Sequence, residues 1–301
     1  MKITVLGQGS FGKALTGILK EKWPGAELSI WRRDCELEPC LRGADYAVFA
    51  VPAQAFREVF AASCGFFEYD TVVVNAAKGI ELGTLKRLSE TARELLPDVR
   101  YAALSGPSHA EELVQGLPAA VTACAEEEDL AVRVRELFMT ENFRVYTGND
   151  LIGTEIGGAV KNVIALAAGI SDGLGFGDNT KAAIMTRGMA EITRLGVALG
   201  ANPETFLGLS GFGDLIVTCT SMHSRNRRCG ILIGQGVPAA EAAREIGMVV
   251  EGIPTARAAA ALSGRCGVEM PITNAVCAVL DGSLSPSESV AALMTRSGKA
   301  E

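Results

Sequence analysis

The sequence predicts an α/β protein, with a doubly wound parallel sheet at the N-terminus and an all-helical C-terminal part. Up to about residue 148, short apolar runs alternate with helix-like segments, which is typical of strands buried on both faces of a parallel sheet. A glycine-rich loop directly follows the first of these runs. After residue 149 the chain contains long Ala-, Gly-, Ile- and Leu-rich segments without strand-like alternation. We therefore expect two domains, 1–149 and 150–301.

The expected elements of the first domain follow one another in regular order. Strands are expected at 3–6, 26–31, 46–51, 71–76, 101–106, 119–124 and 143–146. Helices are expected from the glycine loop to about residue 21, at 84–96 and at 127–138. In the second domain, Asp150 precedes the first long apolar segment and is expected to cap that helix at its N-terminus.

The composition excludes several classes of protein. With 301 residues and 48% hydrophobic residues, the chain is expected to form a folded globular protein. Its net charge of -7, without a long run of one sign, argues against non-specific binding to nucleic acid or anionic membranes. The eight cysteines include no CxxC pair and there are only two histidines, so no metal site is expected.

The location of the protein is predicted from the same survey. The N-terminus shows no signal-peptide pattern, and no uninterrupted apolar run is long enough to cross a bilayer. The most apolar segment, 156–170, is broken by Lys161 and Asn162. We therefore expect a cytoplasmic protein with reduced thiols and no membrane insertion.

The stretch "GQGSFG" has the G-x-G-x-x-G spacing of a dinucleotide-binding loop, at Gly7, Gly9 and Gly12. In a Rossmann-type fold the first glycine permits a tight turn, the second lets a pyrophosphate approach, and the third lets helix and strand pack closely. The helix that follows directs its N-terminus at the phosphates. The alternative is a strand–helix turn without a ligand, but the strand before and the helix after the loop favour a cofactor site.

The second expected strand ends in "WRRD", where such folds distinguish their cofactors. Arginine accommodates the 2′-phosphate of NADP, whereas an acidic residue binds the ribose hydroxyl of NAD. Arg32 and Arg33 therefore favour NADP(H), and Asp34 keeps NAD(H) possible. The alternative is that both arginines are solvated surface charges.

Polar residues also follow two other expected strands, at the sheet edge where open α/β sheets bind ligands. Lys78 follows "VVVNAA", and Gly106, Pro107 and Ser108 follow "YAALS". A Gly-Pro-Ser turn is also a common connector. Two polar turns at the edge that carries the glycine loop nevertheless favour a shared binding site.

The segment "AVKNVIALAAGI" places Lys161 in a helix that otherwise favours burial. A buried ammonium needs a partner, and its lowered pKa suits proton transfer. The alternative is a lysine whose stem packs while its amine reaches water. Asp214, beside the apolar "LIV", is a candidate partner, and we expect Asn162 to hydrogen-bond either the substrate or the lysine.

The stretch "GDLIVTCTSMHSRN" combines an acid with a set of hydrogen-bond donors. Ser224, Arg225 and Asn226 offer a hydroxyl, a guanidinium and an amide, which can together hold a phosphate, and Thr218 precedes them. The alternative is a solvated basic loop. Further on, Glu251 lies between apolar stretches and is interpreted either as a helix cap or as a ligand of a nicotinamide amide or ribose.

Six motifs of the chain together resemble the bacterial NAD(P)-dependent glycerol-3-phosphate dehydrogenases. They are "GxGSFGxAL", "NAAKGIE", "LSGPSHAEE", "AVKNVIALAAGISDGLGFGDNTKAAIMTRGMAEI", "GLSGFGDLIVTCTSMHSRN" and "VEGIPTA". They occur in the family's order, from residue 1 to near residue 294. The resemblance implies reversible reduction of dihydroxyacetone phosphate to sn-glycerol 3-phosphate, the backbone for phospholipid synthesis.

The resemblance also implies roles for individual residues. Lys161 matches the family's proton donor and acceptor, and Lys78 a position that contacts both cofactor and substrate. Further substrate positions are matched by Gly106, Ser108, Asp214, Ser224, Arg225 and Asn226. Cofactor positions, besides the loop glycines, are matched by Ser10, Phe11, Arg32, Arg33, Ala110, Arg225, Val249 and Glu251. Asn162 and Thr218 are expected beside the substrate from their place in the motifs.

The chain departs from the family pattern at two places. Phe11 stands where the family usually has Trp, which keeps an aromatic wall. Only "DCELEPCLRGA" separates the second expected strand from "DYAVFAV", where the family has a longer insert with another helix and strand. The departures concern the cofactor's side of the fold, and the residues proposed for the chemistry are all present.

Two other functions remain open on the sequence alone. A β-hydroxyacid dehydrogenase or ketopantoate reductase also joins a dinucleotide domain to a helical domain with a lysine, but would favour a carboxylate substrate. A non-catalytic NAD(P) sensor would need no substrate residues. We expect a phosphorylated small molecule as substrate, no nucleic-acid partner, and a homodimer formed through the apolar helical half.

Overall fold

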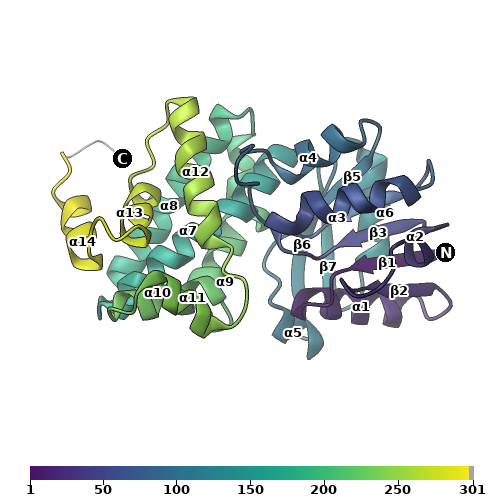
Figure 1. Ribbon diagram of the computed structural model, residues 1–301, viewed down its shortest axis with the longest axis horizontal. Helices are drawn as coiled ribbons and strands as arrows, with labels where there is room; N and C mark the ends of the chain where they lie inside the picture. Colours follow the sequence, from purple (N-terminus) through teal and green to yellow (C-terminus); the bar gives the residue numbers. More distant parts are fainter. Residues whose placement is uncertain (298–301) are drawn as a thin grey trace.

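The computed structural model describes residues 1–297 and consists of a sheet-containing half and a helical half that lie side by side (Figure 1). The strands are β1 (Lys2–Leu6), β2 (Glu27–Trp31), β3 (Tyr46–Phe49), β4 (Val72–Asn75), β5 (Arg100–Ser105), β6 (Ala119–Cys124) and β7 (Phe143–Gly148). The helices are α1 (Ser10–Lys22), α2 (Glu38–Leu41), α3 (Phe56–Ser63), α4 (Leu88–Leu95), α5 (Ala110–Val114), α6 (Glu128–Phe138), α7 (Leu151–Gly173), α8 (Asp178–Ala198), α9 (Asp214–Thr220), α10 (Arg225–Gly234), α11 (Ala239–Ile246), α12 (Gly252–Cys266), α13 (Pro271–Leu280) and α14 (Pro286–Met294).

The seven strands form one sheet in the order β2-β1-β3-β4-β5-β6-β7. β1 pairs in parallel with both β2 and β3, so the chain continues outward in opposite directions on the two sides of β1. Ligands of open α/β sheets bind at such a switch point, beyond the carboxyl ends of the strands. The glycine loop begins at Gly7, directly after β1, and therefore lies at this point.

The expectation of a wholly parallel sheet is wrong at one pair of strands. β5 and β6 are antiparallel, whereas β6 and β7 are again parallel. A parallel return would have to run back along a strand of six residues, about 20 Å. The connection, residues 106–118, instead contains only the five-residue helix α5, which covers about 7.5 Å, and it enters β6 at the end of the sheet where β5 finishes. β6 is apolar like its neighbours, so its sequence does not reveal its direction.

Helices cover both faces of the sheet, as expected from continuously apolar strands. On one face α1, α5 and α6 pack on the sheet through side chains such as Leu15, Leu113 and Val134. On the other face α3 and α4 contribute Phe56, Phe60 and other side chains to a separate core. The strand predictions are confirmed to within a few residues. The helix expected at 84–96 begins only at Leu88, because the preceding segment forms a turn closed by a bridge between Ile80 and Arg87.

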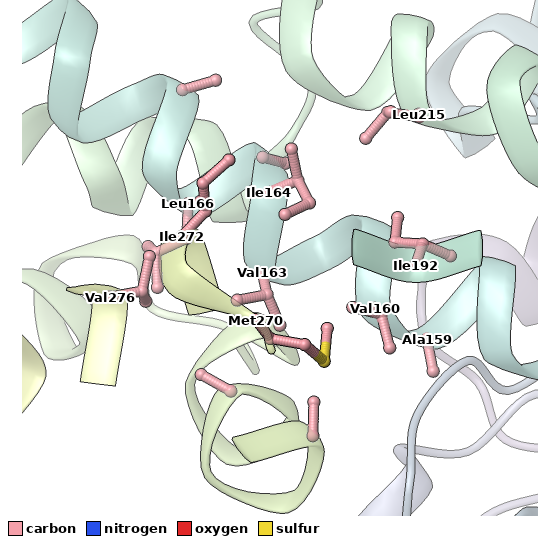
Figure 2. Close-up of a cluster of buried hydrophobic side chains, with 14 of the residues drawn as sticks. Ala159, Val160, Val163, Ile164, Leu166, Ile192, Leu215, Met270, Ile272 and Val276 are labelled. Carbon is pink, nitrogen blue, oxygen red and sulfur yellow. The ribbon is translucent and has the colours of Figure 1, made fainter. Parts of the chain in front are cut away.

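The helical half is built around α7, a helix of 23 residues of which 18 are buried. Figure 2 shows Val160, Val163 and Ile164 of this helix among side chains from the surrounding elements, including Ile192 of α8 and Leu215 of α9. α7 is long and apolar enough to cross a membrane, but 89% of its most apolar window is buried inside the protein, as in the core helix of a folded domain. The Asp150 cap is confirmed, since its carboxylate accepts from the Gly153 amide at 2.9 Å.

Candidate active site

A cavity of about 510 Å³ lies between the two halves. The sheet half contributes the glycine loop and the turns after β3, β4 and β5, and the helical half contributes α7, α9, the start of α10 and the segment before α12. The cavity brings together residues far apart in sequence. The expected site residues that line it are Gly7, Gly9, Ser10, Phe11, Lys78, Ser108, Ala110, Lys161, Asn162, Thr218, Ser224, Arg225, Asn226, Val249 and Glu251.

The glycine loop has the geometry that a dinucleotide phosphate requires. Gly7 has a φ of 114°, and a Cβ there would lie 2.6 Å from the carbonyl oxygen of Ala50. A Cβ on Gly12 would lie 2.0 Å from the carbonyl oxygen of Gly7, so only glycine lets α1 start this close to β1. Nothing lies within 4 Å of a Cβ built on Gly9, which leaves space in front of the amides that begin α1. The loop therefore fits a nicotinamide dinucleotide.

Two lysines from opposite halves converge on one buried carboxylate. Asp214, at the start of α9, accepts from Lys161 of α7 and from Lys78 after β4, the latter at 2.7 Å. Lys161 also donates to the hydroxyl of Thr218 at 2.7 Å. Asp214 is 1% exposed and Lys161 6%, so both charges are held away from bulk water. The expected partnership between Lys161 and Asp214 is therefore present, and Lys78 joins it.

This cluster changes the proton affinity of its members. The pKa of Lys161 is lowered to about 8, chiefly because burial deprives the charged form of solvation; Asp214 partly offsets this effect and Lys78 adds to it. Burial alone would raise the pKa of Asp214, but the two neighbouring ammonium groups hold it below its usual value. At neutral pH the cluster therefore contains a carboxylate and an ammonium that gives up its proton readily.

A π-helical turn at Leu209–Gly213 positions Asp214. Within it, Gly211 packs so closely on Phe206 that a Cβ would lie 2.2 Å from the Phe206 carbonyl oxygen. On the facing helix, a Cβ on Gly157 would lie 2.9 Å from the carbonyl oxygen of Ser210. Small residues on both sides let the turn approach α7, which brings Asp214 within hydrogen-bond reach of Lys161. π-helical turns occur frequently at functional sites.

Asn162 hydrogen-bonds Asn226, and not Lys161, which was one of its two expected partners. Its amide oxygen accepts from Asn226 Nδ2 at 2.9 Å, and its own Nδ2 lies 3.4 Å from the Gly158 carbonyl oxygen. Asn226 Oδ1 in turn accepts from the backbone amide of Gly252 at 2.8 Å. The alternative in which Asn162 hydrogen-bonds the lysine is therefore wrong, since consecutive side chains of a helix diverge by 100°. Asn162 instead orients Asn226 at the cavity wall.

The candidate phosphate cradle lies at the N-terminus of α10. Ser224 is the N-cap residue, and its hydroxyl accepts from the backbone amide of Arg227 at 3.2 Å. Arg225 and Asn226 begin the helix and line the cavity beside Ser224. A helix N-terminus with a guanidinium and an amide suits a phosphate dianion. Arg225 is exposed, in keeping with a side chain that meets its ligand from the open side.

α10 is held against α7 through glycines on both helices. We consider a Cβ built on each of four glycines. It would lie 2.1 Å from the nearest backbone oxygen for Gly169, 2.2 Å for Gly173, 2.2 Å for Gly230 and 2.3 Å for Gly234. Each of these oxygens belongs to the facing helix, so the two backbones are in direct contact. This contact sets where the cradle on α10 lies relative to Lys161 on α7.

Replacing Gly230 with alanine should separate these two helices. The added methyl group would meet backbone atoms of α7 that have no free space to move into, so we expect Gly230→Ala to lower the free energy of unfolding by about 1–3 kcal/mol. Gly264→Ala is the matched control, because the exposed Gly264 of α12 has nothing within 4 Å. That variant should be neutral or more stable by up to about 1 kcal/mol. Equal denaturation midpoints for the two variants would refute this account of the contact.

Five expected residues do not line the cavity, for three different reasons. Gly12 lies behind the loop, and Asp214 lies behind the two lysines. Gly106 has a φ of 140°, and its carbonyl oxygen accepts from Lys78 Nζ at 3.0 Å, so it positions that lysine. Arg32 and Arg33 are exposed beyond β2, where Arg32 Nε lies 3.4 Å from Asp34.

Glu251 occupies the cap position of α12 without capping it through its side chain. The cap interpretation is therefore confirmed for its position, but the side chain is used elsewhere. One carboxylate oxygen accepts from the Ala53 amide across the cleft at 2.9 Å, and the other is buried without a hydrogen-bond partner among residues 1–297. Burial raises the pKa of the Glu251 carboxyl. Glu251 lines the cavity, and its carboxylate fits a ligand that donates hydrogen bonds, such as the nicotinamide amide or a ribose hydroxyl.

The cavity is also lined by two histidines that the sequence did not single out as site residues. His109 and His223 come from opposite halves, and their ring centroids are 5.8 Å apart. His109 lies next to Ser108 and Ala110 in an expected motif, which was the only available signal. Within residues 1–297 no group of three or more metal-ligating side chains is assembled.

Two family models match most of the chain. The N-terminus of NAD-dependent glycerol-3-phosphate dehydrogenase matches residues 32–131, and the C-terminus of the same family matches residues 150–291. A curated relative from Clostridium perfringens, glycerol-3-phosphate dehydrogenase [NAD(P)+], is 47% identical over 329 positions that cover 100% of this chain and 99% of the relative. The relative of the same name from Carboxydothermus hydrogenoformans is 48% identical, covering 100% and 98%.

Solved structures give the same result. The glycerol-3-phosphate dehydrogenase of Coxiella burnetii superposes with a TM-score of 0.93 at 35% identity, covering 98% of this chain and 99% of that one. A ketopantoate reductase from Ralstonia eutropha reaches a TM-score of 0.63 at 14% identity, which reflects a shared fold alone. This chain therefore belongs to the NAD(P)-dependent glycerol-3-phosphate dehydrogenases, a family of oxidoreductases with a Rossmann-type sheet and a helical C-terminal half.

Proposed function

We propose that this protein reduces dihydroxyacetone phosphate reversibly to sn-glycerol 3-phosphate with NAD(P)H, and so supplies glycerophospholipid synthesis. The observation that carries the proposal is the joint attachment of Lys161 and Lys78 to Asp214 at the wall of a cavity that also contains the glycine loop. One cavity is thus lined by a proton donor (Lys161), a second positive charge (Lys78) and the glycine loop proposed to bind the cofactor. Residues 1–149 form the cofactor domain and residues 150–301 the substrate domain in this proposal.

Lys161 is the general acid and base of the proposed reaction. A bound NAD(P)H supplies the hydride to the carbonyl carbon of the substrate. Lys161 donates its proton to the carbonyl oxygen and, while protonated, stabilises the negative charge that develops there. Lys78 adds a second positive charge. Asp214 holds both ammonium groups in place, and in the reverse direction the neutral amine of Lys161 accepts the hydroxyl proton.

The substrate phosphate is proposed to bind at the N-terminus of α10. Ser224, Arg225 and Asn226 hold its oxygens, Ser108 lies on the other side of the cavity, and Gly106 acts through Lys78, which it positions. Asn162, which hydrogen-bonds Asn226, and Thr218, which hydrogen-bonds Lys161, are proposed to contact the bound substrate. A fixed phosphate holds the carbonyl in one orientation toward the proton donor, which lowers the entropic cost of reaction.

The cofactor is proposed to lie along the glycine loop, with NADP(H) favoured over NAD(H). Arg32 and Arg33 are exposed just after β2, where a 2′-phosphate could compete with Asp34 for Arg32, and the family name includes both cofactors. The rest of the cofactor is proposed to contact five further residues that line the cavity: Ser10, Phe11, Ala110, Val249 and Glu251. We further propose a cytoplasmic homodimer, the dimer contact involving the helical half.

Steady-state rates with purified protein test this proposal. We expect oxidation of NADPH with dihydroxyacetone phosphate, a lower kcat/KM with NADH, and negligible turnover with ketopantoate or a 3-keto acid. Loss of the cofactor preference in an Arg32→Ser/Arg33→Ser variant would assign that preference to β2. Faster turnover with a keto acid would support the reductase alternative, and cofactor binding without turnover would support a sensor.

A further inference from the structure

Glu155 is a buried acid on the helix that carries Lys161, yet it takes no part in the proposed chemistry. Its side chain is 7% exposed and does not line the large cavity. A buried carboxylate is costly unless several donors satisfy it, so its partners indicate what it does.

All the hydrogen-bond partners of Glu155 belong to the sheet half. Its carboxylate accepts from the Ser89 backbone amide at 2.9 Å, from Arg87 at 2.9 Å and from the Tyr101 hydroxyl at 2.8 Å. Ser89 lies in the first turn of α4, and Tyr101 lies on β5. The carboxylate of one half therefore caps a helix of the other half, where its negative charge is favoured.

The same face of α7 continues from Glu155 toward the catalytic cluster. Gly158, one turn further, is so close to the sheet half that a Cβ would lie 2.9 Å from Ser105 Oγ and 3.6 Å from Cγ of Lys78. The space enclosed between Glu155, Gly158 and Lys78 is only about 10 Å³, room for a single water. Lys161 follows one turn later, about 9 Å along the helix from Glu155. The Glu155 contacts thus fix the position of α7 along the sheet edge.

We propose that Glu155 is a positioning residue, which sets the register of α7 against the sheet so that Lys161 and Lys78 meet at Asp214. Near this point α7 also contacts the sheet half through Gly158 and through a side-chain hydrogen bond between Thr154 and Cys124, but a thiol bonds weakly compared with a carboxylate that has several donors, so without Glu155 α7 can slide or tilt. A small displacement separates the two lysines and admits water to the cluster. The inference rests on the proposed function, since it is measured through the same reaction.

The test compares Glu155→Gln and Glu155→Ala with Glu90→Gln. Glu90 is a matched control, because it also pairs with Arg87, at 3.4 Å, and caps α4, but it is exposed and does not contact α7. The glutamine side chain keeps an oxygen that can accept from the Ser89 amide and the Tyr101 hydroxyl. The Glu155→Gln variant should therefore be less impaired than Glu155→Ala, and it should stay folded even if Glu155→Ala does not.

The readout is the pH dependence of kcat/KM for reduction, together with kcat and KM. The ionisable groups that act on Lys161 are Asp214 and Cys219 on α9, Lys78 after β4 and, before α5, His109. Moving Lys161 away from Lys78 and admitting water should both favour the ammonium form of Lys161, because burial and Lys78 both lower its pKa. We therefore expect Glu155→Gln to raise the apparent pKa of Lys161 by at least about half a unit and to lower kcat about tenfold, with little change in KM.

Glu90→Gln should keep the wild-type pH profile even if it melts at a lower temperature. The inference is overturned if Glu155→Gln and Glu155→Ala, where folded, show the wild-type profile and kcat, because Glu155 then only stabilises the fold. Absence of turnover in the wild-type protein would instead refute the proposed function, so the two failures are distinguishable.

Discussion

Replacing Lys161 with methionine should lower kcat for reduction of dihydroxyacetone phosphate by about 10²- to 10⁴-fold, the usual contribution of a general acid. Methionine keeps the length of the side chain and suits its buried position. Asp214 would not be left as an unpaired buried charge, since Lys78 still donates to it at 2.7 Å. We therefore expect a folded protein that binds NADPH normally but transfers hydride slowly.

Lys181→Met is the matched control for this variant. Lys181 forms a half-buried ion pair with Asp172 at 2.9 Å, but it does not line the cavity. It should keep wild-type kcat even if the protein loses stability. Steady-state rates, circular dichroism and NADPH binding by fluorescence should be measured on both variants. Near-wild-type turnover in Lys161→Met would remove this residue from the mechanism.

Asp214→Asn should have the second largest effect, and should change the pH dependence as well as the rate. The substitution leaves two ammonium groups close together without their carboxylate. Since Asp214 raises the pKa of Lys161, its loss moves that pKa below about 8 and increases the neutral fraction of Lys161 at neutral pH. We expect kcat/KM for reduction to fall about 100- to 1,000-fold, and part of the loss to be regained at lower pH.

Asp172→Asn tests whether this effect is specific to the cavity. Asp172 also bridges two cations, Lys181 at 2.9 Å and Arg227 at 2.8 Å, but outside the cavity wall. Its substitution should lower stability and leave the pH optimum unchanged. The role assigned to Asp214 would be contradicted if both asparagine variants shifted the pH profile equally, or if neither did.

The local parts of the fold and site could be predicted because local sequence determines them. The spacing of Gly7, Gly9 and Gly12 specifies a turn that only glycine permits, and the apolar runs specify strands. Lys161 stood out because an ammonium is costly in an otherwise apolar helix. The acid that accompanies it could be proposed because Asp214 lies in a similarly apolar segment.

Features that depend on tertiary packing could not be predicted in this way. The antiparallel direction of β6 depends on the length of its connection, and the side chain of Glu251 meets Ala53 only after the halves assemble. Glu155 is unremarkable in sequence, since an acid in the first turns of a helix is common; its partners lie more than 50 residues earlier in the chain. Such long-range polar contacts leave no periodic signal.

The pH dependence of kcat/KM, measured in both directions on the wild-type protein, tests the role of Lys161 most directly. Reduction needs the ammonium, so its kcat/KM should be constant below about pH 8 and fall above it, whereas oxidation of glycerol 3-phosphate needs the neutral amine and should rise through the same pH. Opposite profiles that share one midpoint near pH 8, both abolished in Lys161→Met, are the predicted result. Profiles without a common midpoint, or a midpoint that persists in Lys161→Met, would contradict it.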